Sequence, residues 1–262
     1  MKMGEKELQD AARLLIDSRH AIALTGAGIS TESGIPDFRS PGGIWSRYDP
    51  NEFGTISSFM ENPTRFYEAA GEFLSVFTAD PNQGHKALAE LEEMGILKAT
   101  ITQNIDGLHQ AAGSRKVIEL HGNLREAKCL GCYAVFPIAI LAEKTLQKGE
   151  IPPRCDRCGG ILKPNVVFFG EQLPKEALES AFEHAKRCDL MLVAGSSLAV
   201  SPANLIPMVA REAGAELIIV NAESTHMDTL ASHVFRGKTG VILPKLVEEV
   251  RKLGSGTEEK KY

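Results

Sequence analysis

The chain has 262 residues, of which 43% are hydrophobic and 24% charged, so it can bury a substantial core. Its formal net charge of -5 gives no general attraction to phosphate backbones, which argues against direct binding of nucleic acid. No apolar run reaches the roughly 18 residues that a membrane span needs, and residues 1–10 lack the features of a signal or transit peptide, so we expect a cytoplasmic protein without a membrane partner.

Short apolar runs alternate with helical patterns along most of the chain. A helical pattern within residues 8–15 precedes the apolar run 21–24. Further apolar runs, each followed by polar residues, lie at 99–102, 117–120, 166–169, 190–194 and 217–220, and helical patterns lie at 85–94, 177–186 and 202–213. Because alternating strands and helices favour a parallel sheet covered on both faces, we predict an α/β fold.

Two stretches interrupt this alternation. Residues 45–84 contain several aromatic side chains without strand alternation, which predicts a small helical insert, and residues 123–163 hold most of the cysteines. We expect these stretches to form a second lobe beside a sheet domain made of residues 1–44, 85–122 and 164–253. Residues 254–262 are polar and are expected to be a disordered tail.

The segment 24–39 is the most informative part of the sequence. It leaves the first predicted strand and turns at Gly26 and Gly28, where a backbone without Cβ can approach phosphates, as in dinucleotide folds. Thr31 stands where such a turn usually has its third glycine, and the chain continues into a loop that carries Asp37, Phe38 and Arg39. This combination of acid, aromatic and cation indicates a site for chemistry.

Polar residues follow several of the predicted strands. Gln103, Asn104, Ile105 and Asp106 come directly after the run 99–102, and His121 follows the run 117–120. Gly195, Ser196, Ser197 and Asn221 follow two further strands. Each motif has a purely structural alternative, as a helix cap, a packed histidine or a turn. Their convergence on strand ends, where open parallel sheets bind ligands, favours a site.

The cysteines form two pairs that are typical of a zinc site. Cys129 and Cys132 are separated from Cys155 and Cys158 by 22 residues, and each pair has two residues between its members. Disulfides are the alternative, but two-residue spacing rarely suits a direct bridge. Four thiolates would fill a tetrahedral zinc and leave no open position, so we predict one structural Zn²⁺ per chain. Cys188 is interpreted as a buried packing residue.

The run Val166, Val167, Phe168, Phe169 ends abruptly at Gly170 and Glu171. It is either a central strand or an exposed edge that pairs with an extended peptide, and the pattern alone does not choose.

These motifs, in this order, make the sequence similar to the sirtuins over roughly residues 8–250. The resemblance implies a Rossmann-like sheet domain, a smaller lobe made of a zinc ribbon and a helical insert, and the activity of an NAD-dependent protein lysine deacylase. NAD would be a co-substrate, acyl-lysine proteins or peptides would be the partners, and acetyl-ADP-ribose and nicotinamide would be products.

The resemblance also implies residue roles. His121 would be the general base, with Asn104 and Asp106 as further catalytic residues. NAD would be bound by Gly26, Ala27, Gly28, Thr31, Ile35, Asp37, Phe38, Arg39, Gln103, Asn104, Ile105, Asp106, Gly195, Ser196, Ser197, Asn221, Ala222, Glu223 and Thr239. The acyl-lysine peptide would be bound by Val167, Phe168, Phe169, Gly170, Glu171 and Val200.

One departure from a family pattern concerns the acyl group. Sirtuins that prefer succinyl or malonyl lysine carry a tyrosine and an arginine three residues apart in the helical insert, whereas this chain has Ala70 and Phe73 at the positions we align with them. We therefore expect a preference for acetyl, with longer apolar chains accepted.

The same motifs leave three other functions as alternatives. A mono-ADP-ribosyltransferase would use the same NAD cleavage and is the main alternative. An NAD dehydrogenase is disfavoured by the missing third glycine and by the Asp37 loop. A binding module without turnover is disfavoured by the presence of Asn104, Asp106 and His121 together.

Overall fold

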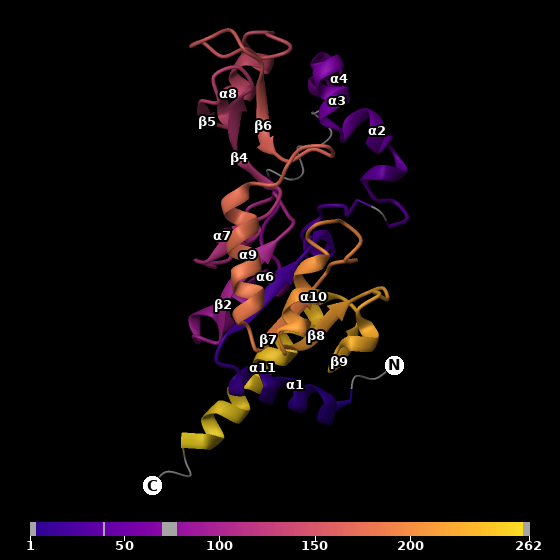
Figure 1. Cartoon of the computed structure of the whole chain (residues 1–262), viewed down its shortest axis with the longest axis vertical. Helices are drawn as coiled ribbons and strands as arrows, with labels where there is room; N and C mark the ends of the chain where they lie inside the picture. The colour runs from indigo at the N-terminus through magenta and orange to yellow at the C-terminus, as the bar shows by residue number, and fades with distance from the viewer. Residues whose placement is uncertain (1–3, 39, 70–77, 259–262) are drawn as a thin grey trace.

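The computed structural model describes residues 4–38, 40–69 and 78–258, which form a large sheet domain and a smaller lobe (Figure 1). The large domain contains a six-stranded sheet in the order β3-β2-β1-β7-β8-β9, in which every neighbouring pair is parallel. Its strands are β1 (Ala21–Thr25), β2 (Leu97–Thr102), β3 (Val117–Glu119), β7 (Leu190–Ala194), β8 (Glu216–Asn221) and β9 (His233–Arg236). This is the predicted Rossmann-like arrangement, with its switch in strand order between β1 and β7.

Helices cover both faces of the sheet, which explains why residues 21–24 of β1 are all apolar. Ala21 and Ala23 pack into the core beneath α1 (Glu5–Asp17), α6 (Gln83–Glu93) and α11 (Thr239–Glu258). Ile22 and Leu24 point to the opposite face and pack with α9 (Lys175–Arg187) and α10 (Leu205–Glu212). Successive side chains of a strand alternate between faces, so a strand that is covered on both faces needs an unbroken apolar run.

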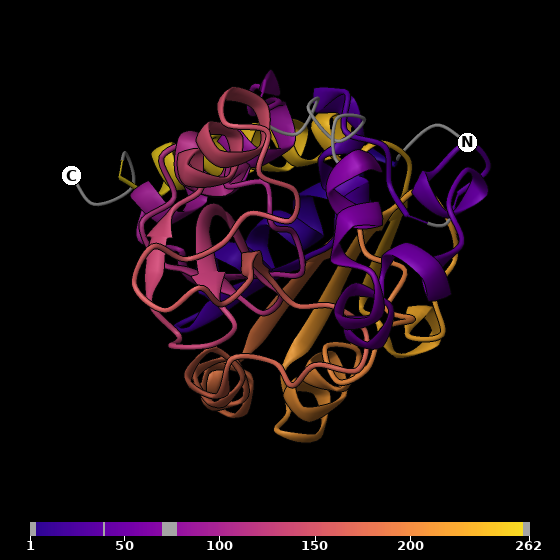
Figure 2. The same cartoon turned by 90° about the horizontal axis from the view of Figure 1, so that it is seen from above.

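The smaller lobe combines two excursions from the sheet domain, as predicted. The helical insert contains α2 (Pro50–Phe53), α3 (Ile56–Glu61) and α4 (Pro63–Ala69). The cysteine-rich segment forms an antiparallel sheet in the order β5-β4-β6, built from β4 (Gly122–Cys129), β5 (Val135–Pro137) and β6 (Leu162–Val166). Helix α8 (Ala139–Ala142) lies between β5 and β6 in the sequence. The two excursions lie together at one end of the molecule, above the parallel sheet (Figures 1 and 2).

The run 166–169 is not a strand of the parallel sheet, which corrects one element of the sequence analysis. The strand in this region is β6, which ends at Val166 and pairs antiparallel with β4 in the smaller lobe. Phe169 makes only an isolated bridge with Thr55 of the helical insert. This run is apolar because its side chains pack in the smaller lobe and line the cavity described below.

Two further differences concern the C-terminal part. Strand β9 was not predicted, because its short run contains His233 and Arg236 and shows no continuous apolar pattern. Helix α11 continues through residues 254–258, where the sequence analysis expected the start of a disordered tail, and residues 259–262 lie outside the described residues. In the described parts of the chain, no helix has both the length and the apolar character that crossing a bilayer requires.

Candidate functional site

A cavity of about 1520 Å³ lies at the carboxyl ends of the parallel strands, between the sheet domain and the smaller lobe. Every described residue that the sequence analysis assigned to catalysis, NAD or the acyl-lysine peptide lines this cavity. Arg39, the remaining member of that set, lies outside the described residues. Segments that are far apart in the sequence therefore contribute to a single site.

The glycine turn after β1 meets the turn after β7 at the point where the strand order reverses. The amide of Gly28 donates a hydrogen bond to the carbonyl oxygen of Gly195 (2.8 Å), and a Cβ on Gly28 would lie 2.8 Å from that oxygen. Gly195 has φ +63°, and a Cβ there would lie 2.2 Å from the amide nitrogen of Ile29. Both glycines are required by this close approach of two backbones, which forms the floor of the cavity.

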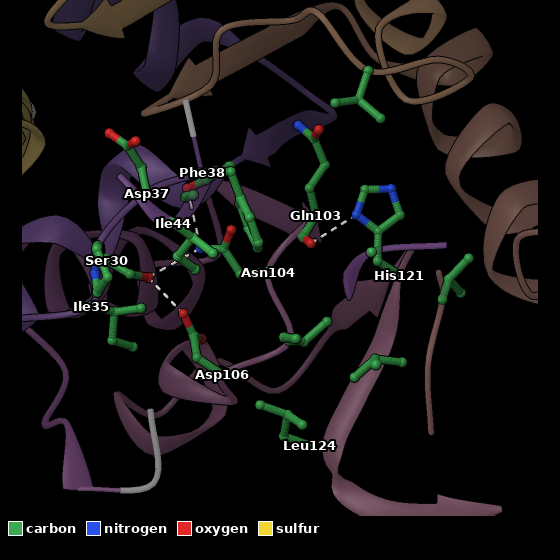
Figure 3. Close-up of a pocket in the computed structure, with 18 of the residues that line it drawn as sticks. Ser30, Ile35, Asp37, Phe38, Ile44, Gln103, Asn104, Asp106, His121 and Leu124 are labelled. Carbon is green, nitrogen blue, oxygen red and sulfur yellow. Dashed lines mark hydrogen bonds between the residues drawn. The ribbon is translucent and has the colours of Figure 1, made fainter. Parts of the chain in front are cut away.

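His121 is held by the turn that follows β2. Its Nδ1 lies 2.9 Å from the backbone carbonyl oxygen of Gln103 (Figure 3). A carbonyl only accepts, so Nδ1 carries the hydrogen and Nε2 is left with its lone pair. Burial lowers the pKa of His121 below its ordinary value of 6.5, while the bond to Gln103 acts in the opposite direction. The imidazole is therefore neutral at pH 7.

Ser30 connects the two other predicted catalytic residues (Figure 3). Its hydroxyl donates to Asp106 Oδ2 (2.7 Å) and accepts from Asn104 Nδ2 (3.1 Å). Asn104 Nδ2 also donates to the carbonyl oxygen of Gly26 (3.1 Å), so its amide plane is fixed. The other oxygen of Asp106 accepts from the amide of Leu108 (2.9 Å) at the start of α7 (Leu108–Ala111). Asp106 thus also has the helix-capping contact that was its structural alternative.

Two buried histidines lie behind this network, and the sequence analysis missed both. His85 Nδ1 accepts from the amide of Asn82 (3.3 Å), so Nε2 carries the hydrogen and lies 3.3 Å from Ser30 Oγ. The ring of His109 packs edge-on against His85, with 4.9 Å between the ring centroids. Burial lowers the pKa of His85 to about 4 and, together with the neighbouring His85, lowers that of His109 to about 3. His85 lies in a predicted helical pattern and His109 lies outside every predicted element, so neither position gave a sign of this role.

A second polar region of the cavity lies over β7 and β8. Ser196 is buried, and its hydroxyl oxygen lies 2.9 Å from the donating Gln103 Nε2. Asn221 Nδ2 donates to the carbonyl oxygen of Glu223 (3.0 Å), which orders the turn after β8. The hydroxyl of Thr239 is buried without a hydrogen-bond partner among the described residues. Because buried hydroxyls are normally paired, this one is available to a bound molecule.

The opposite side of the cavity is apolar. The ring of Phe168 is buried against Phe59 and Phe66, with centroid separations of 5.5 and 5.4 Å. The backbone of Phe169 is already bonded on both sides: its amide donates to the carbonyl oxygen of Gly54 (2.8 Å), and its carbonyl accepts from Ile56 (3.0 Å). Phe169 therefore offers its side chain but not its backbone to a bound peptide.

The four paired cysteines form a compact cluster in the smaller lobe. Their Sγ atoms all lie within 4.8 Å of one another, and the cysteines are free of disulfides. Zn–S bonds of about 2.3 Å in a tetrahedron separate neighbouring sulfurs by about 3.8 Å. The Cys132 and Cys155 sulfurs are 3.8 Å apart, and the amides of Gly131 and Gly160 donate to the sulfurs of Cys129 and Cys158. The donor set fits a structural zinc site.

Comparisons with known proteins agree on one family. The Sir2 family model matches residues 26–202. The chain is 51% identical to NAD-dependent protein deacylase 2 of Archaeoglobus fulgidus over 252 residues, which cover 96% of this chain and 99% of that protein. A solved Sir2 structure with a deacetylated p53 peptide and 3'-O-acetyl ADP-ribose matches with TM-score 0.87 and 44% identity, covering 94% of this chain and 98% of that one. A structure of Sir2 with p53 peptide and NAD⁺ matches with TM-score 0.84 and 42% identity, covering the same shares.

Proposed function

Because this chain belongs to the Sir2 family, we propose that it is an NAD-dependent protein deacetylase. It cleaves NAD, transfers the acetyl group from a lysine side chain to ADP-ribose, and releases nicotinamide and the free lysine. The observation that carries this proposal is the shared cavity. The carboxyl ends of the parallel strands, where dinucleotide folds bind their ligand, border the same space as a neutral histidine and an apolar wall.

The polar part of the cavity suits NAD. The glycine turn brings backbone amides close to the sheet edge, as diphosphate binding needs. We assign the part bordered by Ser196, Asn221 and Thr239 to adenosine, and the part bordered by Asn104 and Asp106 to nicotinamide. We propose that hydrogen bonds from the part bordered by Asn104 and Asp106 hold the carboxamide of nicotinamide while the nicotinamide ring leaves the ribose.

The apolar part suits an acylated lysine. An acyl-lysine is uncharged, so it enters an apolar channel at much lower cost than an ammonium group. The described lining of this part includes Val166, Val167 and Phe168. A channel of this kind selects the modified lysine over the unmodified one.

The chemistry requires a weak nucleophile to attack a sugar carbon. An amide oxygen is weak, so the bond between nicotinamide and ribose has to loosen first, and positive charge develops on the ribose. The acetyl oxygen then bonds to that carbon as nicotinamide leaves. His121 Nε2 takes the proton from a ribose hydroxyl, whose oxygen attacks the former amide carbon, and water completes the release of lysine. A positioned base contributes roughly 10²–10⁴-fold.

The deciding experiment incubates the protein with NAD and a panel of acyl-lysine peptides and identifies the products by mass spectrometry. Equal amounts of nicotinamide, deacetylated peptide and acetyl-ADP-ribose are expected. Added nicotinamide should inhibit by returning to its pocket. Label transfer from NAD to protein without loss of the acetyl group would instead establish ADP-ribosyl transfer, and formation of NADH would establish a dehydrogenase.

The protein substrates in this proposal are acyl-lysine proteins in general, because the cavity lining accounts for the acyl group and not for the side chains that flank the lysine. The cytoplasmic location and the absence of nucleic-acid and membrane partners stay predictions from the sequence.

A further inference from the structure

Lys163 is a buried lysine beside the apolar part of the cavity. It lies on β6, and its side chain is only 5% exposed. A charged amine is costly to bury unless all of its hydrogen-bond donors are paired. Burial lowers the pKa of Lys163, whereas the nearby Glu171 carboxylate acts in the opposite direction. A methionine of similar volume would fill this space without that cost, so the charge calls for an explanation.

The ammonium group has an acceptor for each of its three N–H bonds. Lys163 Nζ donates to the carbonyl oxygen of Val166 (2.6 Å), to that of Pro164 (3.3 Å) and to Glu171 Oε2 (3.0 Å). It also lies 4.2 Å from the centroid of the Phe168 ring. With all donors used, the amine is fixed in place, and the contacts span the segment from the end of β6 to Glu171.

The segment that Lys163 contacts is a tight turn. The amide of Glu171 donates to the carbonyl oxygen of Phe168 (3.0 Å), and Gly170 has φ +88°, which a glycine adopts without strain. Glu171 Oε2 accepts from the amide of Phe168 (2.7 Å) as well as from Lys163. One carboxylate oxygen therefore closes the turn and joins it to β6.

Phe168, Gly170 and Glu171 all line the cavity, on the side assigned to the acyl-lysine peptide. We propose that Lys163 is a positioning residue that fixes this turn, and with it the Phe168 wall of the acyl-lysine subsite. The inference rests on the proposed function. Lys163 does not act on the substrate itself, because Lys163 is absent from the cavity lining and its donors are already paired.

The test is steady-state kinetics of Lys163→Met with the acetyl peptide and NAD varied in turn. We expect the KM for peptide to rise on the order of 10- to 100-fold, as for a misplaced binding wall. The KM for NAD should stay within about two-fold, because its part of the cavity is untouched. A peptide KM within about two-fold of the wild-type value would overturn the proposal.

Lys144→Met is the matched control. Lys144 is also buried and ion-paired, to Glu150 and Asp156, but it lies in the zinc-ribbon segment and does not line the cavity. A general loss of stability would change both variants alike, whereas a positioning role raises the peptide KM in Lys163→Met alone. Equal changes in the two variants would contradict the proposal.

Hydrogen exchange tests the contacts between Lys163 and the turn without depending on catalysis. The amides of Phe168 and Glu171 should exchange faster in Lys163→Met than in the wild type or Lys144→Met, and unchanged exchange would refute the contact's role. If the wild type consumes no acyl peptide, the proposed function fails. The exchange rates of the Phe168 and Glu171 amides still show whether Lys163 fixes the turn. If Lys163→Met does not fold, Lys163→Met/Glu171→Gln removes both charges, and the same faster exchange at Phe168 is required of it.

Discussion

His121 donates its Nδ1 hydrogen to the backbone carbonyl oxygen of Gln103 across 2.9 Å. Gln103 is itself fixed, because its amide donates to the carbonyl oxygen of Thr25 (3.0 Å) and its side chain donates to Ser196 (2.9 Å). The orientation of the imidazole is thus set by Gln103, which follows β2 and is bonded to the end of β1 and to Ser196 after β7. This arrangement selects one tautomer and leaves Nε2 as the basic nitrogen.

His121→Ala should lose deacetylation while keeping the fold and NAD binding. The expected loss in kcat is roughly 10²–10⁴-fold, the contribution of a positioned general base. Product formation and NAD binding by calorimetry measure the two effects separately. His226→Ala is the matched control, because His226 is exposed and does not line the cavity. Near-normal turnover of His121→Ala would show that the assigned role is wrong.

The pH dependence of kcat/KM should report the same residue. The base must be neutral to accept a proton, and burial lowers the pKa of His121 below 6.5. Activity should therefore stay level as the pH falls from about 8 to 6.5 and decline only at lower pH. Circular dichroism at each pH verifies that the protein is folded. An acidic limb centred above 6.5 would contradict the neutral, buried imidazole.

The buried pair His85 and His109 predicts a loss of stability in acid. Their folded pKa values of about 4 and about 3 lie below the ordinary value of 6.5, so the unfolded chain binds more protons between these limits. The free energy of unfolding should fall as the pH drops below 6.5, and each unit of depression is worth about 1.4 kcal/mol.

His109→Gln tests whether the free energy of unfolding falls in acid because of His109. An amide can still donate to Thr25, which lies 2.9 Å from His109 Nε2, but it does not titrate. Urea unfolding at a series of pH values should show a weaker pH dependence below 6.5 for this variant, with the exposed His226→Gln as control. An unchanged slope in His109→Gln would mean that His109 is not held neutral.

The strand ends of the site could be predicted from the sequence because each predicted strand is a short, mainly apolar run that is followed directly by polar residues. That pattern located Gln103, Asn104 and His121 at one edge of the sheet without coordinates. The zinc site could also be predicted, because the two-residue spacing in each cysteine pair suits zinc ligation and rarely suits a disulfide. The polar residues at the strand ends come together because the carboxyl ends of parallel strands lie at the same edge of the sheet.

The supporting residues could not be predicted in this way. His85 lies 55 positions from Ser30 in the chain, and only the tertiary fold brings its ring to the hydroxyl. Lys163 is a charged residue at the end of the predicted zinc-ribbon segment 123–163, so its sequence context suggests exposure rather than burial. The run 166–169 could not be placed from the sequence, because apolar residues that line a cavity have the same composition as those of a central strand.

Cys129→Ala should release zinc and unfold the smaller lobe. Cys129 ends β4, whose first residue, Gly122, follows His121, so loss of the metal should also disturb the site. Structural zinc contributes on the order of 10 kcal/mol to small zinc modules. Elemental analysis should find one zinc per chain in the wild type and a large deficit in the variant.

Cys188→Ala is the control for this experiment. Cys188 is buried between α9 and β7, away from the cluster, and burial raises the pKa of its thiol to about 12. This variant should keep its zinc. Full zinc retention in Cys129→Ala would show that Cys129 is not a ligand.

The acyl preference follows from charge. The described residues that line the cavity include no arginine, and its two lysines, Lys175 and Lys238, are exposed to solvent. The apolar side contains Leu124, Val166 and Phe168. Ala70 and Phe73, which the sequence analysis aligned with the tyrosine and arginine of succinyl-preferring sirtuins, lie outside the described residues. A succinyl carboxylate would be buried here without a countercharge, so its kcat/KM should be about 100-fold or more below that of acetyl.

Matched acetyl, butyryl and succinyl peptides of one sequence measure this preference. Acetyl and butyryl should both be removed, because the two added methylene groups meet apolar walls. The Ala70→Tyr/Phe73→Arg variant supplies the missing pair and should narrow the gap between succinyl and acetyl, whereas Ala70→Tyr alone should not. Comparable kcat/KM values for succinyl and acetyl in the wild type would place a cation near the acyl group and defeat the charge argument.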